Sequence, residues 1–289
     1  MDMTKPITAC DHETFYATLT QRNKGLIGDA WQRRLRTTRF VVAGCGSTGG
    51  ACVMPLVRSG AERFVLLDPG SYELDNLNRQ EATLDDVGVN KAAATRDRIA
   101  AVNPFAEVEV FEDGVSAETI ASRLLPGDFV IDAVDVTTDD GVKAKFALHE
   151  AACELCLKVL TAYDIAATQF IELFDYEAID APLRGRVSGS LTTESVLRAL
   201  VPPSALPREI FAELRARRDD PGRGFPQLAM TSALFGAVAV AYLLRAINGE
   251  PVKRRVRIDL FDETRPRAAR LLARLRRDIG LVGLWWRFR

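Results

Sequence analysis

The sequence has 289 residues, 47% of them hydrophobic, and a formal net charge of -1. This length holds one large α/β domain or two small ones, with enough apolar side chains for a core that needs no metal or disulfide. The near-neutral balance gives no reason to expect nucleic acid or an anionic membrane surface as a partner. Five scattered cysteines, and a start without signal-peptide features, predict a cytoplasmic protein.

Residues 1–39 form an N-terminal helical segment in our prediction. The stretch from Phe15 to Arg39 predicts a helix with Asp29 as its cap, because an aspartate side chain accepts hydrogen bonds from the first free N–H groups of a helix. Arg22 lies in this segment, within QRNKGLIG. Taken alone, it is typical of a solvated surface arginine.

A glycine-rich turn follows the first predicted strand. Residues 40–43, FVVA, are an apolar run that ends at Gly44, and Gly44, Gly46 and Gly49 complete the pattern G-x-G-x-x-G. The first glycine permits a tight turn, the second lets backbone approach a phosphate, and the third lets a helix lie close to the strand. The helix expected over 49–59 then offers free N–H groups to an anion. A nucleotide phosphate is the natural ligand.

A second strand, over 62–68, ends in Asp68 at the distance expected of an acid that binds a ribose. The chain continues as GSYELDNLNRQ and then GVNK instead of a second helix. Two cations follow the phosphate turn, with neutral hydrogen-bonding side chains beside them: Arg79, Lys91, Asn76, Asn78 and Gln80. A polyphosphate that is being cleaved needs such cations, because negative charge builds on its oxygens, whereas a nicotinamide cofactor does not.

Helices and strands alternate in the following part of the chain. The expected helices cover 90–102, 117–125 and 141–156, and the expected strands cover 107–111, 129–133, 158–162 and, antiparallel, 169–176. This alternation predicts an α/β fold with a Rossmann-like, mostly parallel sheet and helices on both faces, extended by antiparallel strands and a crossover segment. Residues 40–176 are the predicted nucleotide-binding domain.

Composition changes at Glu177. Residues 177–226 are rich in Pro, Arg, Ser and Gly, with two short helices expected over 193–200 and 207–218. A connection of this length with so little core indicates a functional excursion.

Residues 227–262 are expected to complete the domain. Leu228 to Leu244 carries no charge, but it is short for a membrane span and rich in small residues, so we expect a buried core helix. A strand over 255–261 follows.

Residues 263–289 form a basic C-terminal tail. Ala268 to Leu275, with Ile279, can form an amphipathic helix, and two tryptophans stand near the end of the chain. We expect this helix to pack its leucine stripe on its own domain. Docking to a partner or to a membrane surface is the alternative.

Several motifs together resemble one family. They are GCGSTGG, LLDPGSYELDNLNRQ, VGVNK, AAVNP at 100–104 and FVIDAVD at 129–135. With them the sequence resembles the ThiF/MoeB/HesA adenylyltransferases of the ubiquitin-activating-enzyme superfamily, over about residues 22–249. The resemblance implies ATP-dependent activation of a carboxylate as an acyl adenylate, with release of pyrophosphate. The C-terminus of a small carrier protein or peptide is the expected substrate, and the resemblance implies that residues 177–226 are a crossover segment that guides it.

The resemblance also assigns site residues. Arg79, Lys91 and Arg22 match family cations that contact the triphosphate, and Arg22 would reach the active site of the other subunit in a homodimer. Asp135 matches the family's metal-binding aspartate and would hold Mg²⁺. Asp132 is the second choice, and otherwise a capping or turn residue.

Two departures from the family pattern are visible. Asp68 would bind the adenosine ribose, but Gly70 replaces the second acid that the family often has there. Val136 replaces an asparagine that commonly follows the metal-binding aspartate. With Gly70, one contact that the family makes with the ribose is missing.

The cysteines bear on metal and mechanism. Cys153 and Cys156 form a C-x-x-C on a predicted helix, and no cysteine follows them in the sequence. Structural zinc needs four ligands, so we expect no zinc site and two buried helix cysteines. The crossover also lacks the cysteine with which some family members form a thioester or persulfide. The adenylate is therefore expected to pass to an external nucleophile.

Three other functions stay open. A relative of tRNA threonylcarbamoyladenosine dehydratase would activate a small carboxylate on a modified tRNA base, which makes tRNA a less favoured partner. A catalytically silent scaffold would bind ATP without turnover. An NAD-dependent oxidoreductase fits the glycine turn but not Arg79, Lys91 and Asp135. Asp139 and Asp140 are expected to cap a helix, and His12 and His149 receive no role.

Overall fold

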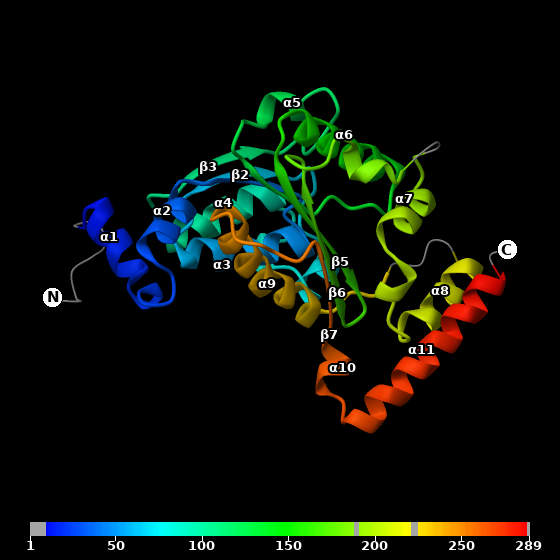
Figure 1. The fold of residues 1–289 in the computed structure, drawn as a ribbon. Helices are drawn as coiled ribbons and strands as arrows, with labels where there is room; N and C mark the ends of the chain where they lie inside the picture. The colour runs from blue at the N-terminus through cyan, green and yellow to red at the C-terminus, as the bar shows by residue number, and fades with distance from the viewer. Residues whose placement is uncertain (1–9, 188–190, 221–224, 288–289) are drawn as a thin grey trace.

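A computed structural model describes residues 10–187, 191–220 and 225–287 (Figure 1). Its 7-stranded sheet has the order β3-β2-β1-β4-β5-β6-β7. The strands are β1 (Arg39–Ala43), β2 (Arg63–Leu67), β3 (Glu107–Phe111), β4 (Phe129–Asp132), β5 (Lys158–Ile165), β6 (Thr168–Asp175) and β7 (Arg255–Asp259). Neighbouring strands from β3 to β5 pair in parallel, and β5–β6 and β6–β7 pair antiparallel. The predicted α/β fold with a mostly parallel sheet is confirmed.

Helices cover both faces of this sheet (Figure 1). The α-helices are α1 (His12–Leu19), α2 (Asp29–Thr37), α3 (Ser47–Ser59), α4 (Lys91–Val102), α5 (Ile120–Arg123), α6 (Asp139–Glu154), α7 (Thr193–Leu200), α8 (Ile210–Asp219), α9 (Ala229–Ile247), α10 (Leu260–Thr264) and α11 (Arg267–Arg287). The 3-10 turns are η2 (Gln21–Asn23), η3 (Leu74–Asn78), η4 (Leu84–Asp86), η5 (Pro182–Gly185) and η6 (Pro203–Ala205). One face carries α3, α4 and α9, and the other carries α5, α6 and α7.

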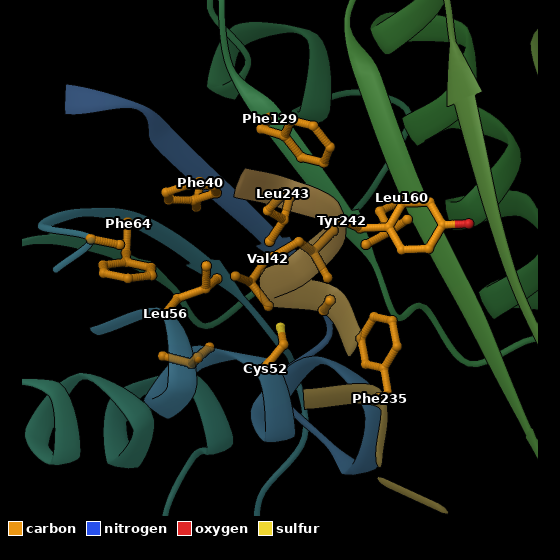
Figure 2. Packing of buried hydrophobic residues seen from close by; sticks show 14 of the residues in the cluster. Phe40, Val42, Cys52, Leu56, Phe64, Phe129, Leu160, Phe235, Tyr242 and Leu243 are labelled. Atoms are coloured by element: carbon orange, nitrogen blue, oxygen red, sulfur yellow. The ribbon is translucent and has the colours of Figure 1, made fainter. Parts of the chain in front are cut away.

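The larger core lies between the sheet and the helices α3 and α9. Successive residues of β1 point to opposite faces, so Phe40 and Val42 enter this core while Val41 faces α6. Figure 2 shows Phe40 and Val42 beside Leu56 of α3 and Leu243 of α9. Because every residue of β1 is buried, its residues after Arg39 appear in the sequence as a continuous apolar run rather than an alternation.

Helix α9 packs closely on α3. A Cβ atom at Gly236 would lie 2.3 Å from the backbone oxygen of Ala51, so glycine is needed for this approach. By length and composition α9 could also cross a membrane, with a mean hydropathy of 1.7 over a window that is 44% buried. The buried residues lie along one stripe of the helix that includes Phe235, Ala239 and Leu243. The expected core helix is therefore buried along one face and not on all sides.

Several helix boundaries differ from our predictions. Gly28 holds the cap position of α2, and Asp29 is its first residue. Thr138 caps α6 by accepting a hydrogen bond from the N–H of Gly141 at 3.1 Å, so Asp139 and Asp140 lie in the first turn, where their charge still favours the helix dipole. The helix expected over 117–125 is the four-residue α5.

The crossover is tied to the sheet by a buried acid that we did not predict. Glu172 of β6 is 1% exposed and accepts two hydrogen bonds from the guanidinium of Arg186, at 2.7 and 2.9 Å. Burial alone would raise the pKa of Glu172, but the hydrogen bonds and charges of Arg186 and Arg255 outweigh it and lower the pKa. This charged pair fixes the beginning of the segment 177–226 on β6.

The C-terminal helix contradicts our packing prediction. Helix α11 lies beside α8, away from the sheet (Figure 1). It docks through small residues, since Ala273 is buried and a Cβ at Gly280 would lie 2.6 Å from the Phe211 ring. The leucine stripe points to solvent: Leu271 is 64% exposed and Leu275 is 54% exposed. Ala273 and Gly280 allow α11 to approach α8 closely, and the leucines on the opposite face of α11 take no part in this packing.

Candidate functional site

The glycine turn lies at the carboxyl edge of the sheet, between β1 and β4. The chain moves outward from β1 to β2 and β3, and then in the other direction from β4 to β5, so the strand order reverses here. Ligands of open α/β sheets bind at such a point. Gly44 has φ +94°, and a Cβ atom there would lie 2.5 Å from the oxygen of Ala133. A Cβ at Gly49 would lie 1.8 Å from the oxygen of Gly44.

Helix α3 begins directly at this turn. Gly46 occupies its cap position and offers no side-chain hydrogen bond, so the first N–H groups of the helix stay available to a ligand. The side chain of Gln80 lies close by, with its Oε1 atom 3.6 Å from an ideal Cβ at Gly46. This Oε1 atom is buried and has no hydrogen-bond partner among the described residues. Buried polar atoms are nearly always paired, so a polar ligand fits this position.

Asp68 supports the turn from the end of β2. Its Oδ2 accepts a hydrogen bond from the N–H of Cys45 at 2.6 Å, and its Oδ1 accepts one from the N–H of Gly70 at 2.8 Å. Burial raises the pKa of Asp68, although these N–H groups and the charge of Lys91 oppose the rise. A carboxylate has about four acceptor positions, so Asp68 can still accept hydrogen bonds from a ribose.

The segment after Asp68 contains the two predicted amide side chains. Asn76 is 6% exposed; its Oδ1 accepts from the N–H of Glu73 at 3.3 Å, and its Nδ2 donates to Asp75 Oδ1 at 2.9 Å. Asn76 therefore closes the turn η3. Asn78 Nδ2 donates to the backbone oxygen of Gln227 at 3.5 Å, which links this segment to the end of the crossover.

Arg79 is held by neutral groups. Its Nη1 donates to Asn78 Oδ1 at 2.7 Å and to the oxygen of Asp75 at 3.0 Å, and its Nε donates to Gln227 Oε1. Gln227 itself forms an isolated bridge with Ala166 at the tip of the β5–β6 hairpin. Because these partners leave the positive charge uncompensated, Arg79 can still attract an anion. Sequence spacing gave no signal for Gln227, which is 148 residues away from Arg79.

Lys91 is the first residue of α4 and lies beside Gly70, in the segment that follows Asp68. Its Nζ lies 5.8 Å from the ring centre of Tyr72, and it would be 3.7 Å from a Cβ at Gly70. Asn90 caps the helix by accepting hydrogen bonds from the N–H groups of Ala92 and Ala93, at 2.9 and 3.1 Å. The cap fixes the start of α4, and with it the position of the lysine.

The two candidate acids after β4 have different surroundings. Asp135 is exposed, and its Oδ1 accepts a hydrogen bond from the N–H of Thr137 at 2.8 Å. Asp132 is 1% exposed and pairs with Lys145 and with His149 Nε2, the latter at 2.9 Å. Burial alone would raise the pKa of Asp132, but Lys145 and His149 outweigh it and lower the pKa. Asp135 is therefore free to bind a cation, and Asp132 is committed to the interior.

A chain of hydrogen bonds continues from Asp132 to the crossover. His149 Nδ1 accepts from the Tyr176 hydroxyl at 2.6 Å, and the Tyr176 oxygen accepts from the N–H of Leu183 at 3.0 Å. Burial lowers the pKa of His149, which agrees with a neutral ring that donates only to Asp132. We gave His149 no role, but it connects β4 to η5.

No group of three or more His, Cys, Asp or Glu side chains able to hold a metal occurs in the described part of the chain. The C-x-x-C differs from our expectation, because Cys153 is partly buried and Cys156 is exposed. Cys156 lies beyond α6 with φ +55°, so it is no longer a helix residue.

Arg22 lies at the far end of α3 from the glycine turn. It is exposed, and its turn η2 is anchored where Asn23 Nδ2 donates to the oxygen of Ser59 at 3.0 Å. Ser59 is the last residue of α3, whose 13 residues span about 20 Å. Arg22 therefore does not lie at the glycine turn of its own chain.

Comparison with known proteins gives the same family that the motifs indicated. The sequence model of the ThiF family matches residues 19–277. The uncharacterized protein MT1398 of Mycobacterium tuberculosis (strain CDC 1551 / Oshkosh) is 32% identical over 262 residues, which is 85% of this chain. This chain spans 35% of the length of that protein.

Further relatives match most of their own length. The tRNA threonylcarbamoyladenosine dehydratase of Escherichia coli (strain K12) is 27% identical over 271 residues, covering 79% of this chain and 98% of that protein. The crystal structure of the E. coli enzyme TcdA with ATP has a TM-score of 0.60 at 22% identity, and covers 83% of this chain and 98% of that one. The crystal structure of PaaA has a TM-score of 0.63 at 18% identity, covering 90% and 74%. These structural likenesses show the fold.

Proposed function

This chain belongs to the ThiF family, and we propose that it is an ATP-dependent adenylyltransferase that activates a carboxylate as an acyl adenylate and releases pyrophosphate. The observation that carries the proposal is the placement of Arg79 and Lys91 at the carboxyl edge of the sheet. Lys91 lies near Gly70 beside Asp68, which accepts a hydrogen bond from the N–H of Cys45 in the glycine turn. Gln80, the neighbour of Arg79 in the chain, approaches Gly46, the cap residue of α3, where no side chain caps the helix. Cations and free N–H groups together favour a polyphosphate, because both compensate charge on its oxygens.

In this proposal the nucleotide lies across the glycine turn. Gly44, Gly46 and the first turn of α3 bind phosphates, and Asp68 accepts hydrogen bonds from the ribose. The unpartnered Oε1 of Gln80 is an acceptor for a nucleotide N–H or hydroxyl group.

Mg²⁺ fits the donor set at this edge. Asp135 presents an exposed carboxylate, and Mg²⁺ in nucleotide sites needs one or two carboxylates, since phosphates and waters supply the other ligands. The ion would neutralise charge on the phosphate oxygens. Asp135 would hold it, and Arg79 and Lys91 would compensate the remaining charge.

The expected substrate is the C-terminus of a small carrier protein or peptide, which would enter beneath the crossover. Contacts of Arg186 with Glu172 and of Gln227 with Arg79 hold the two ends of that segment in place. A second candidate is activation of a small carboxylate on a tRNA base. This candidate is favoured by the likeness to tRNA threonylcarbamoyladenosine dehydratase along 98% of that protein.

We also propose a homodimer in which Arg22 serves the partner's site. The position of η2, about 20 Å along α3 from the glycine turn, supports a role in another subunit rather than in its own.

ATP–pyrophosphate exchange with Mg²⁺ tests the function. The panel of carboxylates contains free amino acids, synthetic peptides with free carboxyl ends, small carrier proteins and tRNA. We expect exchange that depends on one class of carboxylate, and that class identifies the substrate. ATP binding without exchange would favour a silent scaffold, and binding of NAD in place of ATP would favour the oxidoreductase.

A further inference from the structure

A partly buried acid lies beside the glycine turn, near the tip of the β5–β6 hairpin. The Oδ2 atom of Asp164 accepts hydrogen bonds from Ser47 Oγ at 3.1 Å and from Ser232 Oγ at 3.0 Å. Ser47 is the first residue of α3, directly after Gly46, and Ser232 lies near the start of α9. Asp164 thus lies where two helix N-termini meet, next to the proposed phosphate site.

The second carboxylate oxygen of Asp164, Oδ1, is buried and has no such hydrogen-bond partner in the described part of the chain. Gln169 is the cross-strand neighbour of Asp164 and is fully buried, and neither of its amide atoms has a hydrogen-bond partner of regular geometry among the described residues. Its side chain lies close enough to Asp164 to lower the pKa of that carboxyl. Two such side chains on one face of the hairpin are unusual, because buried polar groups are nearly always satisfied. They match a bound molecule that offers hydrogen-bonding groups.

The surroundings make Asp164 a suitable proton acceptor. Burial raises the pKa of Asp164, while the hydrogen bonds from Ser232 and Ser47, the nearby amide of Gln169 and the charge of Arg79 oppose the rise. A carboxylate with a raised pKa accepts a proton more readily near neutral pH than an ordinary surface acid. The influence of Arg79 also places Asp164 within the field of a proposed phosphate-binding cation.

The proposed reaction needs such an acceptor in its second step. The sequence contains no cysteine after Cys156, so the crossover provides no thiol to take the acyl group. The acyl group would then pass to an external nucleophile. An amine that attacks an acyl adenylate must lose a proton, and general bases typically accelerate such steps about 10²–10⁴-fold.

We propose that Asp164 is the general base of the acyl-transfer step, with an amine as the acceptor; this inference rests on the adenylyltransferase activity proposed above. The amine nitrogen forms a bond to the acyl carbon. The bond from that carbon to the adenylate oxygen breaks, and AMP leaves with its electron pair. The proton from the nitrogen passes to Oδ1 of Asp164, and Ser47 and Ser232 hold the carboxylate in position.

Asp164→Asn separates the two half-reactions. Adenylation is followed by ATP–pyrophosphate exchange with the carboxylate that exchanges fastest in the panel. Acyl transfer is followed by AMP release in the presence of methylamine, glycinamide or hydroxylamine. We expect exchange to change less than about threefold and AMP release with methylamine or glycinamide to fall about 100-fold or more. Hydroxylamine, which is largely unprotonated and highly reactive at neutral pH, should still trap the acyl group.

Two further variants make the result decisive. Asp164→Glu keeps a carboxylate and should recover part of the amine reaction, and Asp139→Asn, an exposed acid on α6, is the matched control. Loss of exchange in Asp164→Asn, unchanged amine-dependent AMP release in it, or AMP release by the unaltered protein that no amine accelerates would each overturn the inference. An unaltered protein without any exchange would instead overturn the proposed adenylation itself.

Discussion

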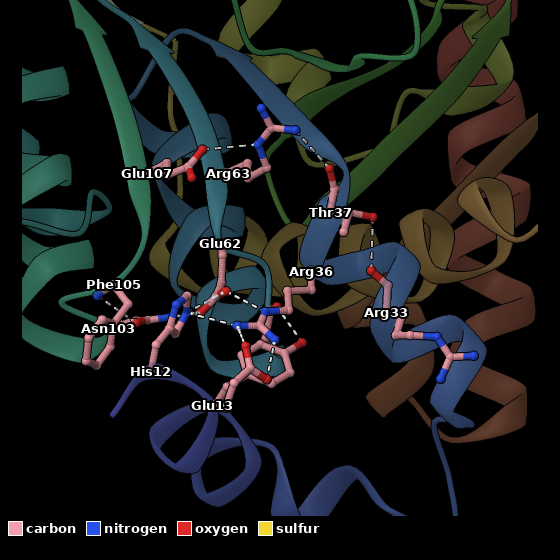
Figure 3. Close-up of polar contacts among 12 residues, drawn as sticks. His12, Glu13, Arg33, Arg36, Thr37, Glu62, Arg63, Asn103, Phe105 and Glu107 are labelled. Atoms are coloured by element: carbon pink, nitrogen blue, oxygen red, sulfur yellow. Dashed lines mark hydrogen bonds and ion pairs between the residues drawn. The ribbon is translucent and has the colours of Figure 1, made fainter. Parts of the chain in front are cut away.

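The two ends of the sheet treat their polar side chains in opposite ways. At the amino end, the buried Glu62 accepts hydrogen bonds from Arg36 Nε at 2.7 Å and from Asn103 Nδ2 at 2.9 Å, and its Oε1 lies 2.9 Å from His12 Nε2 (Figure 3). At the carboxyl end, Gln80 and Asp164 each keep a buried oxygen without a partner among the described residues. The hydrogen-bonded side chains at the amino end hold the N-terminal helix α1 on the domain, whereas the oxygens without a partner at the carboxyl end are suited to bind a ligand.

The volume of a hollow does not indicate which end of the sheet binds the substrate. A hollow of about 410 Å³ lies at the amino end, lined by His12, Arg36, Glu62, Arg63 and Glu107 among others. These side chains are already paired with one another (Figure 3). The carboxyl edge carries Arg79, whose hydrogen-bond partners among the described residues are neutral, and the N–H groups of α3 that no side chain caps.

The largest expected effect comes from removing a cation at the carboxyl end. Arg79→Ala should lower the rate of ATP–pyrophosphate exchange about 10²–10³-fold, because charge developing on the phosphates loses a fixed partner. Asp135→Ala should be equally inactive. Arg63→Ala, at the other end and paired with Glu107 on the surface, is the matched control and should keep its rate. Full activity of Arg79→Ala, with an unchanged melting temperature, would contradict the assignment.

The next effect is on stability, at the amino end. Glu62→Gln should lower the free energy of unfolding by about 1.5–3 kcal/mol, since a side chain that is 6% exposed loses charged hydrogen bonds. Glu107→Gln, whose side chain is 77% exposed, should change it by less than about 0.5 kcal/mol. Denaturant unfolding measures both. Equal effects of the two substitutions would show that the paired network does not stabilise the fold.

A smaller effect is expected where the crossover contacts Arg79. Gln227→Ala removes one neutral hydrogen-bond partner, so exchange at fixed ATP should fall about 3- to 10-fold. Gln227→Glu should not restore the rate, because its carboxylate would compensate the guanidinium charge that the phosphates need. Gln21→Ala, an exposed glutamine on η2, is the control. An unchanged rate in Gln227→Ala would mean that Arg79 is positioned by Asp75 and Asn78 alone.

The smallest effect is a pH dependence of stability. Burial lowers the pKa of His149, whereas the unfolded value is about 6.5. Below pH 6.5 the unfolded chain binds a proton that the folded chain does not, so stability falls as the pH falls towards the folded pKa. His149→Gln should flatten this slope between pH 7.5 and 5.5, with His12→Gln as the control for loss of a histidine. Identical slopes in the variant and the unaltered protein would contradict a buried neutral ring.

Local patterns were sufficient for much of the fold. The buried strand β1, the glycine turn and the capped helix α4 each depend on neighbouring residues, so their sequences predicted them. The contacts of Asp132 with Lys145 and His149 were not foreseen, because both partners lie on α6 and meet the strand only when the two elements pack. No pattern in the sequence around Gln227 indicated its contact with Arg79.

Asp164 could have been found from the sequence. It comes two residues after the predicted strand 158–162, and the argument that placed Asp135 at a carboxyl edge applies to it equally. The true strand, β5, extends to Ile165, so the end of the strand was placed too early. The exposed leucines of α11 could not be foreseen, since an amphipathic pattern does not show which face will meet the domain.

The distance between Arg22 and the glycine turn has a consequence for mixtures of variants. If each site takes Arg22 from one subunit and Arg79 from the other, Arg22→Ala and Arg79→Ala are each inactive alone. Subunit exchange between them creates heterodimers in which one site carries both defects and the other carries neither. An equal mixture should therefore regain activity in about a quarter of all sites. The two inactive preparations would become active when combined.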